Sequence, residues 1–207
     1  MKKILLLGAN GQVGHELRRS LSGLGMIVPT TRSGRLPEGV TCEVADFDQP
    51  QSLPGLLERS RPDLVVNAAA YTAVDGAEDD AGAAWRANAE APAMLADYCA
   101  NQGIALVHYS TDYVFDGTCG RPYREDDVTA PIGAYGASKR AGEEAILRSG
   151  APHLIFRTAW AYGARGSNFM LTMLRLAKEY DELRVVSDQR GTPTPAWLIA
   201  DLTAEII

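Results

Sequence analysis

The N-terminal segment constrains the fold of this chain more than any other part. A short apolar run, residues 4–7, suits a strand buried on both faces of a parallel sheet, and it leads directly into a glycine-spaced segment, residues 8–14. Residues 12–23 then carry apolar side chains at helical spacing. In such a strand, turn and helix, glycines let the backbone approach a pyrophosphate closely, and the helix N-terminus meets its charge. The segment therefore predicts a βα unit that binds a dinucleotide.

Strand and helix patterns alternate through the rest of the chain. Further strands are predicted at residues 26–30, 40–45, 64–69, 105–109 and 153–157, and helices at 53–59, 83–101 and 137–147. Repeated βα units with right-handed crossovers predict an α/β fold, a Rossmann-type doubly wound parallel sheet flanked by helices. Ligands of such sheets bind beyond the carboxyl ends of the strands.

Composition excludes several classes of protein. The net charge of −6 gives no electrostatic reason to bind nucleic acid. The apolar run that ends at Gly8 is too short for an export signal or a membrane span. Cys42, Cys99 and Cys119 are scattered and form no metal-ligand pattern. We therefore expect a cytoplasmic protein with reduced thiols and no metal site.

Tyr135 and Lys139 are the strongest candidates for chemistry. Residues four apart share one face of a helix, so the lysine ammonium can stabilise a tyrosine phenolate and lower the pKa of the phenol toward neutrality. This pair predicts a proton-transfer device.

Polar residues follow the predicted strands. Arg32, after the second strand, suits the 2′-phosphate of NADPH, and no acidic residue lies there to hold the ribose of NADH. We therefore expect NADPH as the preferred cofactor, with NADH as the alternative. Asp46 and Phe47, after the third strand, are candidates to hydrogen-bond and stack on adenine.

Five motifs together resemble a known family. They are residues 8–14 (GANGQVG), 67–75 (NAAAYTAVD), 110–117 (STDYVFDG), 135–139 (YGASK) and 157–160 (RTAW). They look like the extended short-chain dehydrogenase/reductases, and specifically the family of dTDP-4-dehydrorhamnose reductases. The resemblance extends from Met1 to about Ala200. It implies NAD(P)H-dependent reduction of the C4 ketone of dTDP-4-dehydro-6-deoxy-L-mannose to dTDP-L-rhamnose.

The resemblance also implies roles for individual residues. Tyr135 would donate a proton to the alkoxide, Thr111 would hydrogen-bond the same oxygen, and Lys139 would lower the pKa of Tyr135 and hold the nicotinamide ribose. Asn88 would support the site through hydrogen bonds. The residues implied in cofactor binding are Gly8, Asn10, Gly11, Gln12, Val13, Gly14, Arg32, Asp46, Phe47, Ala68, Ala69, Ala70, Tyr135 and Lys139. Those implied in substrate binding are Val74, Asp75, Thr111, Asp112, Tyr113, Trp160 and Asn168.

The chain departs from the family pattern in two respects. Some members form a dimer around a magnesium ion held by glutamates. Glu16 occupies one of those positions, but Trp197 occupies the other, so we expect no magnesium and doubt that dimer. Members also run on beyond this length. We therefore expect a cofactor-binding domain at residues 1–160 and, at 161–207, only the start of an incomplete C-terminal sugar-nucleotide lobe, whose final amphipathic helix exposes an apolar face.

Two other functions remain open. One is a nucleotide-sugar epimerase or dehydratase of the same superfamily, although the dehydratase pattern has Asp-Glu after the threonine and this chain has Asp112-Tyr113. The other is a noncatalytic, cofactor-binding regulatory subunit. Retention of Tyr135 and Lys139 argues against it.

Overall fold

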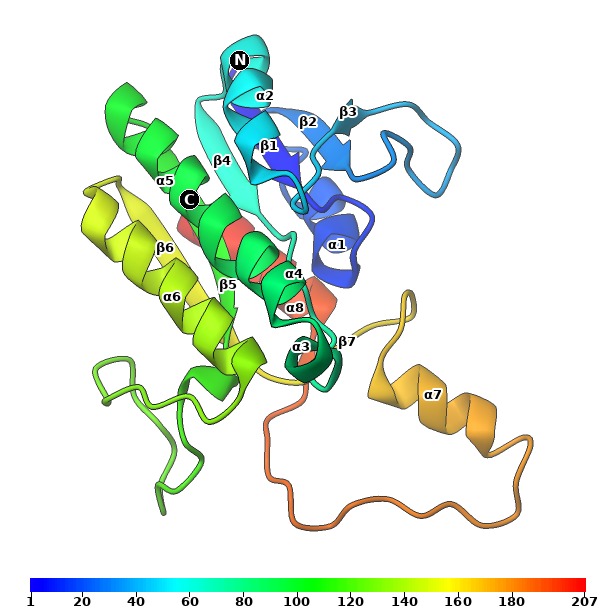
Figure 1. Ribbon diagram of the computed structural model, residues 1–207. Coiled ribbons are helices and arrows are strands. Elements are labelled where there is room, and N and C mark those ends of the chain that lie inside the picture. The colour runs from blue at the N-terminus through cyan, green and yellow to red at the C-terminus, as the bar shows by residue number, and fades with distance from the viewer.

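A six-stranded, wholly parallel sheet forms the centre of the molecule (Figure 1). The computed structural model describes all 207 residues. The strand order is β3-β2-β1-β4-β5-β6, which confirms the predicted doubly wound sheet. The strands are β1 (Lys3–Leu7), β2 (Met26–Thr31), β3 (Glu43–Val44), β4 (Leu64–Asn67), β5 (Ala105–Thr111) and β6 (His153–Thr158).

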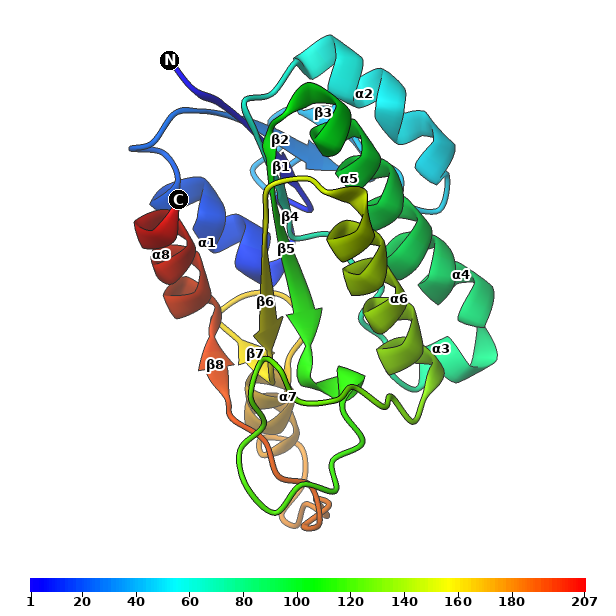
Figure 2. The ribbon, with the colours of Figure 1, turned by 90° about the vertical axis from the view of Figure 1, so that its left-hand side faces the viewer.

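Helices cover both faces of this sheet (Figure 2). One face carries α1 (Gln12–Ser20) and α8 (Ala196–Ile206), and the other carries α2 (Leu53–Ser60), α5 (Ala91–Gln102) and α6 (Ala134–Ser149). Because side chains alternate along a strand, Leu5 and Leu7 of β1 enter one core while Ile4 and Leu6 enter the other. This two-sided burial explains why the central strands are continuous apolar runs.

Two predicted elements differ in detail from those observed. The third strand is limited to Glu43–Val44, a two-residue strand at the edge of the sheet whose side chains are both exposed. The helix predicted at 83–101 is three helical segments in succession: α4 (Ala81–Trp85), a π-helical turn (Arg86–Glu90) and α5. No periodicity in this alanine-rich sequence marks the π-turn.

The carboxyl ends of the strands carry the remaining small elements. These are two 3₁₀ turns (Pro50–Ser52 and Asp112–Val114), α3 (Gly76–Asp79), α7 (Phe169–Leu176) and a parallel pair made of β7 (Ala161–Tyr162) and β8 (Thr194–Pro195). Figure 1 shows α7 and the chain that joins it to α8 extending away from the sheet. Helix α8 returns to the body, where Ile199 and Ala200 join the core beside α1. Its apolar face is therefore half covered, with Trp197, Leu202 and Ile206 left exposed. No helix has the length and apolarity needed to cross a membrane.

The π-helical turn, Arg86–Glu90, packs closely against α6. Asn88 is fully buried and accepts a hydrogen bond from the backbone N–H of Tyr71 at 2.9 Å, while its amide donates to the Ser138 hydroxyl on α6 at 3.1 Å. Gly142 lies directly against the turn, and a Cβ there would overlap the carbonyl oxygen of Asn88. The absence of a side chain at 142 is thus required by the packing.

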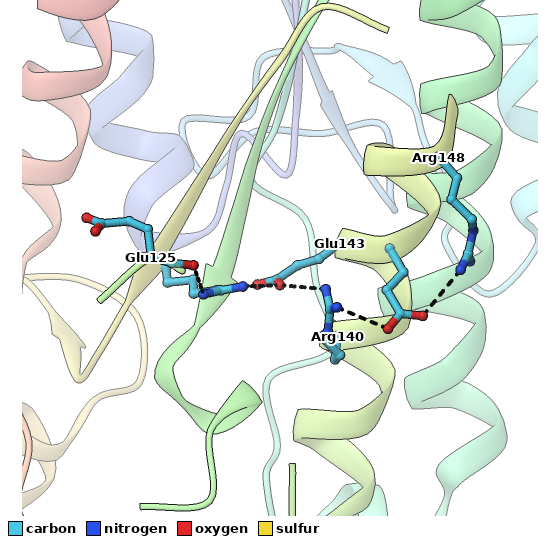
Figure 3. Close-up of polar contacts among 6 residues, drawn as sticks. Glu125, Arg140, Glu143 and Arg148 are labelled. Atoms are coloured by element: carbon cyan, nitrogen blue, oxygen red, sulfur yellow. Dashed lines mark hydrogen bonds and ion pairs between the residues drawn. The ribbon is translucent and has the colours of Figure 1, made fainter. Parts of the chain in front are cut away.

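A buried ion pair attaches α6 to β6 from the other side (Figure 3). Glu143 has a 1% exposed side chain and receives two hydrogen bonds from the Arg157 guanidinium, at 2.8 and 2.9 Å. Arg157 also donates to the Glu125 carbonyl at 3.2 Å and lies 5.0 Å over the Phe115 ring. Figure 3 shows Arg140 extending the network toward the surface, where Arg148 pairs with Glu144. The hydrogen-bonded Glu143 carboxylate raises the pKa of Arg157 further, so the guanidinium stays charged.

We predict that Gly142→Ala lowers the free energy of unfolding by about 1–3 kcal/mol, because the new methyl group must displace backbone rather than a flexible side chain. Gly55→Ala is the matched control: it is also helical, and the nearest atom to its Cβ is the mobile end of Arg59 at 3.6 Å. At position 55, alanine has a higher helix propensity than glycine, so the substitution should raise the free energy of unfolding by up to about 1 kcal/mol. Urea denaturation measures both, and equal effects would contradict the packing described.

We predict that Arg157→Met costs about 3–5 kcal/mol of stability at pH 7, because it leaves the Glu143 carboxylate buried without its main partner. The loss should shrink at pH 5, where an unpaired carboxyl can take up a proton. Arg148→Met, at an exposed pair with 71% of the arginine side chain accessible, should change stability by less than about 1 kcal/mol. Chemical denaturation at both pH values tests this, and similar losses for the two variants would refute it.

Candidate active site

The glycine turn after β1 forms an anion-binding cradle. Gly8 has φ of 77°, and a Cβ there would lie 2.7 Å from the Ala69 nitrogen, so only glycine fits. At Gly14 a Cβ would overlap the Gly8 carbonyl oxygen. Helix α1 begins after Gly11 with no side-chain cap and no acidic residue in its first turn. Its free N–H groups and positive dipole end therefore suit a pyrophosphate.

The far side of the turn contacts a segment distant in sequence. The Asn168 amide donates to the Gln12 side chain at 2.7 Å and to the Gly163 carbonyl at 2.9 Å, and its oxygen caps α7 at the Leu171 N–H. Gln12 in turn donates to the Ser167 carbonyl at 3.2 Å. Asn168, which the resemblance implies in substrate binding, thus joins the glycine turn to α7. Asn10 is exposed and Val13 half-buried at the same turn.

The residues expected at the adenosine end lie together beyond β2 and β3. The Arg32 side chain is 77% exposed and lies 3.5 Å from the Asp48 carboxylate. Asp46 accepts a hydrogen bond from the Asp48 N–H at 3.1 Å. Phe47 packs into the core between the sheet and α2, leaving 8% of its surface exposed. Arg32 is therefore exposed and held only by a surface ion pair, while Phe47 contributes chiefly to the core.

The loop after β4 runs beside the glycine turn. Ala68 and Ala69 are half-buried and Ala70 is exposed. The Ala69 N–H donates to Asn67 at 3.1 Å, which fixes the start of the loop. Val74 and Asp75 lie further along, ahead of α3.

Thr111 and Tyr135 meet at the carboxyl end of β5. Thr111 is buried, donates to Asp112 at 3.2 Å and accepts from the Tyr113 N–H at 3.2 Å. Burial raises the pKa of the Tyr135 phenol, a hydrogen bond with the Thr111 hydroxyl lowers it, and the Asp112 charge raises it. Burial likewise raises the pKa of Asp112, while the hydrogen bond from the Thr111 hydroxyl lowers it. Two hydroxyl groups are thus brought to one point, and the phenol holds its proton at neutral pH.

The Lys139 ammonium lies deeper than the phenol. Its Nζ donates to the Tyr109 carbonyl at 2.6 Å and lies 3.5 Å from Nε2 of His108. Burial lowers the pKa of Lys139 to about 8, and the Glu143 charge opposes this shift. Tyr135 and Lys139 do share the inner face of α6, but the ammonium is turned to β5 rather than to the phenol.

Two partly exposed aromatic residues follow strands β5 and β6. The Tyr113 ring is 38% exposed and meets the Tyr135 ring edge-on, with centroids 5.6 Å apart. Trp160 is 40% exposed, has a left-handed backbone with φ of 46°, and lies 6.2 Å from the Phe169 ring. A non-glycine residue in this region is strained, which is a frequent property of ligand-contacting residues.

Several polar residues near the site were given no individual role from the sequence. Asn67, His108, Ser110 and Glu143 are buried, and Arg157 is half-buried. The Ser110 hydroxyl is buried without a partner among the protein atoms. A signal existed for two of them: His108 and Ser110 interrupt an apolar strand that reads Ala-Leu-Val-His-Tyr-Ser-Thr.

The two residues considered for a magnesium bridge lie on neighbouring helices. Glu16, on α1, is 3.7 Å from Arg19, and Trp197, on α8, is 52% exposed. No group of three or more His, Cys, Asp or Glu side chains is placed to hold a metal ion.

Comparison with known proteins identifies the family. The family described as "RmlD substrate binding domain" matches residues 1–207. The dTDP-4-dehydrorhamnose reductase of Burkholderia thailandensis is 53% identical over 205 residues, which cover 99% of this chain and 65% of that protein. The enzyme of the same name from Escherichia coli K12 is 46% identical over 204 residues, covering 99% and 66%. The chain thus spans just under two thirds of the length of these relatives.

Solved structures show the same similarity. A dTDP-4-dehydrorhamnose reductase from Clostridium acetobutylicum superposes with a TM-score of 0.89 at 38% identity, covering 99% of this chain and 69% of that one. The Bacillus anthracis enzyme, solved in complex with NADP, superposes with a TM-score of 0.89 at 35% identity, covering 100% of this chain and 70% of that one. By its sequence and by its fold, the chain belongs to the RmlD substrate binding domain family, together with these dTDP-4-dehydrorhamnose reductases.

Proposed function

We propose that this chain carries the cofactor site and the proton-donating residues of a reductase. The reaction is NADPH-dependent reduction of the C4 ketone of dTDP-4-dehydro-6-deoxy-L-mannose to dTDP-L-rhamnose. Family membership supports the substrate, since the relatives at 46–53% identity carry that name. Two observations carry the proposal: the Thr111 hydroxyl acts on the Tyr135 phenol at the carboxyl end of β5, and the N-terminus of α1 has no side-chain cap.

The two hydroxyls suit the charge that develops in a carbonyl reduction. When bound, NADPH supplies the hydride that the ketone carbon accepts. Negative charge then builds on the former carbonyl oxygen, and donors placed there act on the transition state more than on the ground state. Tyr135 would give its proton to that oxygen, and Thr111 would hydrogen-bond it. A phenol with a raised pKa is fully protonated before the reaction and so is ready to donate.

The cradle fits a dinucleotide by its own geometry. The residues that would hold the pyrophosphate are those of the turn from Gly8 to Gly14, because the glycines let this turn pack tightly and it leads into the uncapped N-terminus of α1. Arg32, with Asp46, would hold the adenosine ribose and its phosphate, and Ala68, Ala69 and Ala70 would border the nicotinamide half. Lys139 would reach the nicotinamide ribose. A neighbour solved with NADP, at 35% identity, supports NADPH as the cofactor.

Residues 1–160 would provide this cofactor domain, and residues 161–207 the start of the sugar-nucleotide region, with α8 returning to the core of the former. The exposed rings of Tyr113 and Trp160 would border the sugar nucleotide, with Val74, Asp75 and Asp112 nearby. We also propose that no magnesium bridge forms at Glu16, because an indole at 197 supplies neither an oxygen ligand nor a charge.

We predict that Tyr135→Phe lowers turnover by about 100-fold or more, because the variant lacks the proton that the alkoxide takes up. The test follows NADPH absorbance with freshly generated dTDP-4-dehydro-L-rhamnose. NADPH affinity, measured by fluorescence titration, should change little. Tyr98→Phe is the matched control, since that phenol lies on α5 and donates to the Leu57 carbonyl at 3.3 Å.

The outcomes separate the candidate functions. Formation of dTDP-rhamnose by the wild type and not by Tyr135→Phe supports the reductase. Cofactor binding with no turnover in either protein would favour a noncatalytic subunit. Conversion of a nucleotide sugar without net NADPH consumption would favour an epimerase or dehydratase.

We predict that Arg32→Ala weakens NADPH binding about ten-fold and leaves NADH binding unchanged, because only NADPH carries the 2′-phosphate that pairs with a guanidinium. Arg59→Ala removes another exposed arginine, paired with Glu43 at 3.3 Å, and should alter neither affinity. Equal losses for both cofactors in Arg32→Ala would place Arg32 outside the phosphate site.

A further inference from the structure

A buried chain of polar groups lies behind Lys139. It joins the Ala69 N–H, the Asn67 amide, the His108 imidazole and the Lys139 amine, and so runs from the loop after β4, across β5, to α6. The exposed fractions of Asn67, His108 and Lys139 are 1%, 0% and 2%. At this depth each donor needs an acceptor among the protein atoms.

The directions of these hydrogen bonds follow from the Ala69 end. The Ala69 N–H can only donate, and it lies 3.1 Å from the Asn67 side-chain oxygen, which orients the amide. The Asn67 amide nitrogen then faces Nδ1 of His108 at 3.1 Å. An amide nitrogen only donates, so Nδ1 must accept. A neutral imidazole whose Nδ1 accepts carries its proton on Nε2.

This tautomer has a consequence for Lys139. The Nε2–H points at the lysine Nζ across 3.5 Å. If Lys139 is an ammonium, two donors face each other. If it is a neutral amine, the imidazole donates to the nitrogen lone pair and every group in the chain is satisfied. Burial and the Lys139 charge hold the pKa of His108 well below its usual value, so the ring stays neutral.

We propose that His108 is a positioning residue that acts through Lys139: held in the Nε2–H tautomer by Asn67, it favours the neutral amine of the lysine. The proposal names a function for two residues, Asn67 and His108, outside the Thr111, Tyr135 and Lys139 set. Its effect on turnover rests on the proposed reductase function, whereas its effect on the protonation of Lys139 does not.

The other groups around Lys139 do not replace His108 in this role. Glu143, one turn along α6, favours the ammonium, but its charge is matched by Arg157 from β6. The Tyr109 carbonyl from β5 accepts a proton from either form of the lysine. Asp112 and Tyr135, at the end of β5 and the start of α6, interact with each other rather than with the lysine. The His108 imidazole is the neighbour that can donate a hydrogen bond to the neutral amine of Lys139 but not to its ammonium form.

The first test reads the tautomer in the wild-type protein. With ¹⁵N-labelled histidine, long-range ¹H–¹⁵N spectra separate the two neutral tautomers and the imidazolium, and the chain has only three histidines to assign. His108 should show a proton on Nε2 from pH 6 to pH 9. A proton on Nδ1, or an imidazolium at pH 7, would overturn the proposal.

The second test follows the lysine. The chain has four lysines, so ¹³Cε labelling gives few signals, and Lys139→Met assigns the one of interest. His108→Asn keeps an oxygen near the Nδ1 position for Asn67 and removes the group that faces Lys139. The titration midpoint of Lys139, about pH 8 in the wild type, should rise by about one unit.

A second variant provides an independent check. In Asn67→Asp, the carboxylate can only accept, from the Ala69 N–H on one side and from His108 on the other. The histidine proton should therefore move to Nδ1, and Nε2 should become an acceptor for the Lys139 ammonium. The tautomer should switch and the Lys139 midpoint should again rise. A His108→Asn protein that is less stable but has an unchanged Lys139 midpoint would show that His108 is only a core residue.

Turnover supplies the last readout. If the reductase activity is confirmed, its loss at alkaline pH should move upward with the Lys139 midpoint in His108→Asn. If the Lys139 midpoint rises in His108→Asn but the alkaline loss of turnover stays at the same pH, His108 does not act on catalysis through Lys139. Absence of turnover in the wild type would refute the proposed function while the two NMR tests still decide the role of His108.

Discussion

Helix α6 has to lie tightly against the sheet, and the rest of the site depends on this constraint. Tyr135, Lys139 and Glu143 follow one another at intervals of four, so all three face inward. Each is met by a group from a strand: the Thr111 hydroxyl, the Tyr109 carbonyl and the Arg157 guanidinium. An inward face with an ionisable group on every turn would be unstable alone, because burying an unpaired charge costs several kcal/mol. The partners supplied by β5 and β6 therefore allow α6 to bury this face, and the position of α6 in turn sets how far Tyr135 and Lys139 lie from the end of β5.

Close packing on the opposite side completes this arrangement. The π-turn at Asn88 and the bare backbone of Gly142 allow α6 to approach, and Asn88 also holds the loop after β4 through Tyr71. One buried asparagine thus connects α6 to the loop that runs beside the glycine turn. The depth that results lowers the pKa of Lys139 and raises that of Tyr135. Both shifts arise from desolvation and not from contact between the two side chains.

Prediction from the sequence succeeded where the physical signal was local. The glycine turn, the buried strands and the alternating helices followed from periodicity and from the special backbone needs of glycine, and the doubly wound parallel sheet followed from the crossover rule. Prediction was less complete where the signal was tertiary. The π-turn, the short edge strand β3 and the pairing of β7 with β8 depend on partners far along the chain. The hydrogen bonds by which Asn168 joins α7 to the glycine turn also depend on residues far apart in the sequence.

The sequence by itself determined the fold class and the glycine turn after the first strand, and it supplied the motif that proposes Thr111, Tyr135 and Lys139 as the reacting set, because hydrophobic period, turn chemistry and motif spacing can all be read along the chain. Only the tertiary structure decided how those residues are poised. It turned Lys139 toward His108 and the Tyr109 carbonyl, gave Glu143 its arginine, and placed Asn67 where it selects the histidine tautomer. Proton affinities depend on burial and on the direction of hydrogen bonds from other elements, and neither quantity is carried by spacing along one helix.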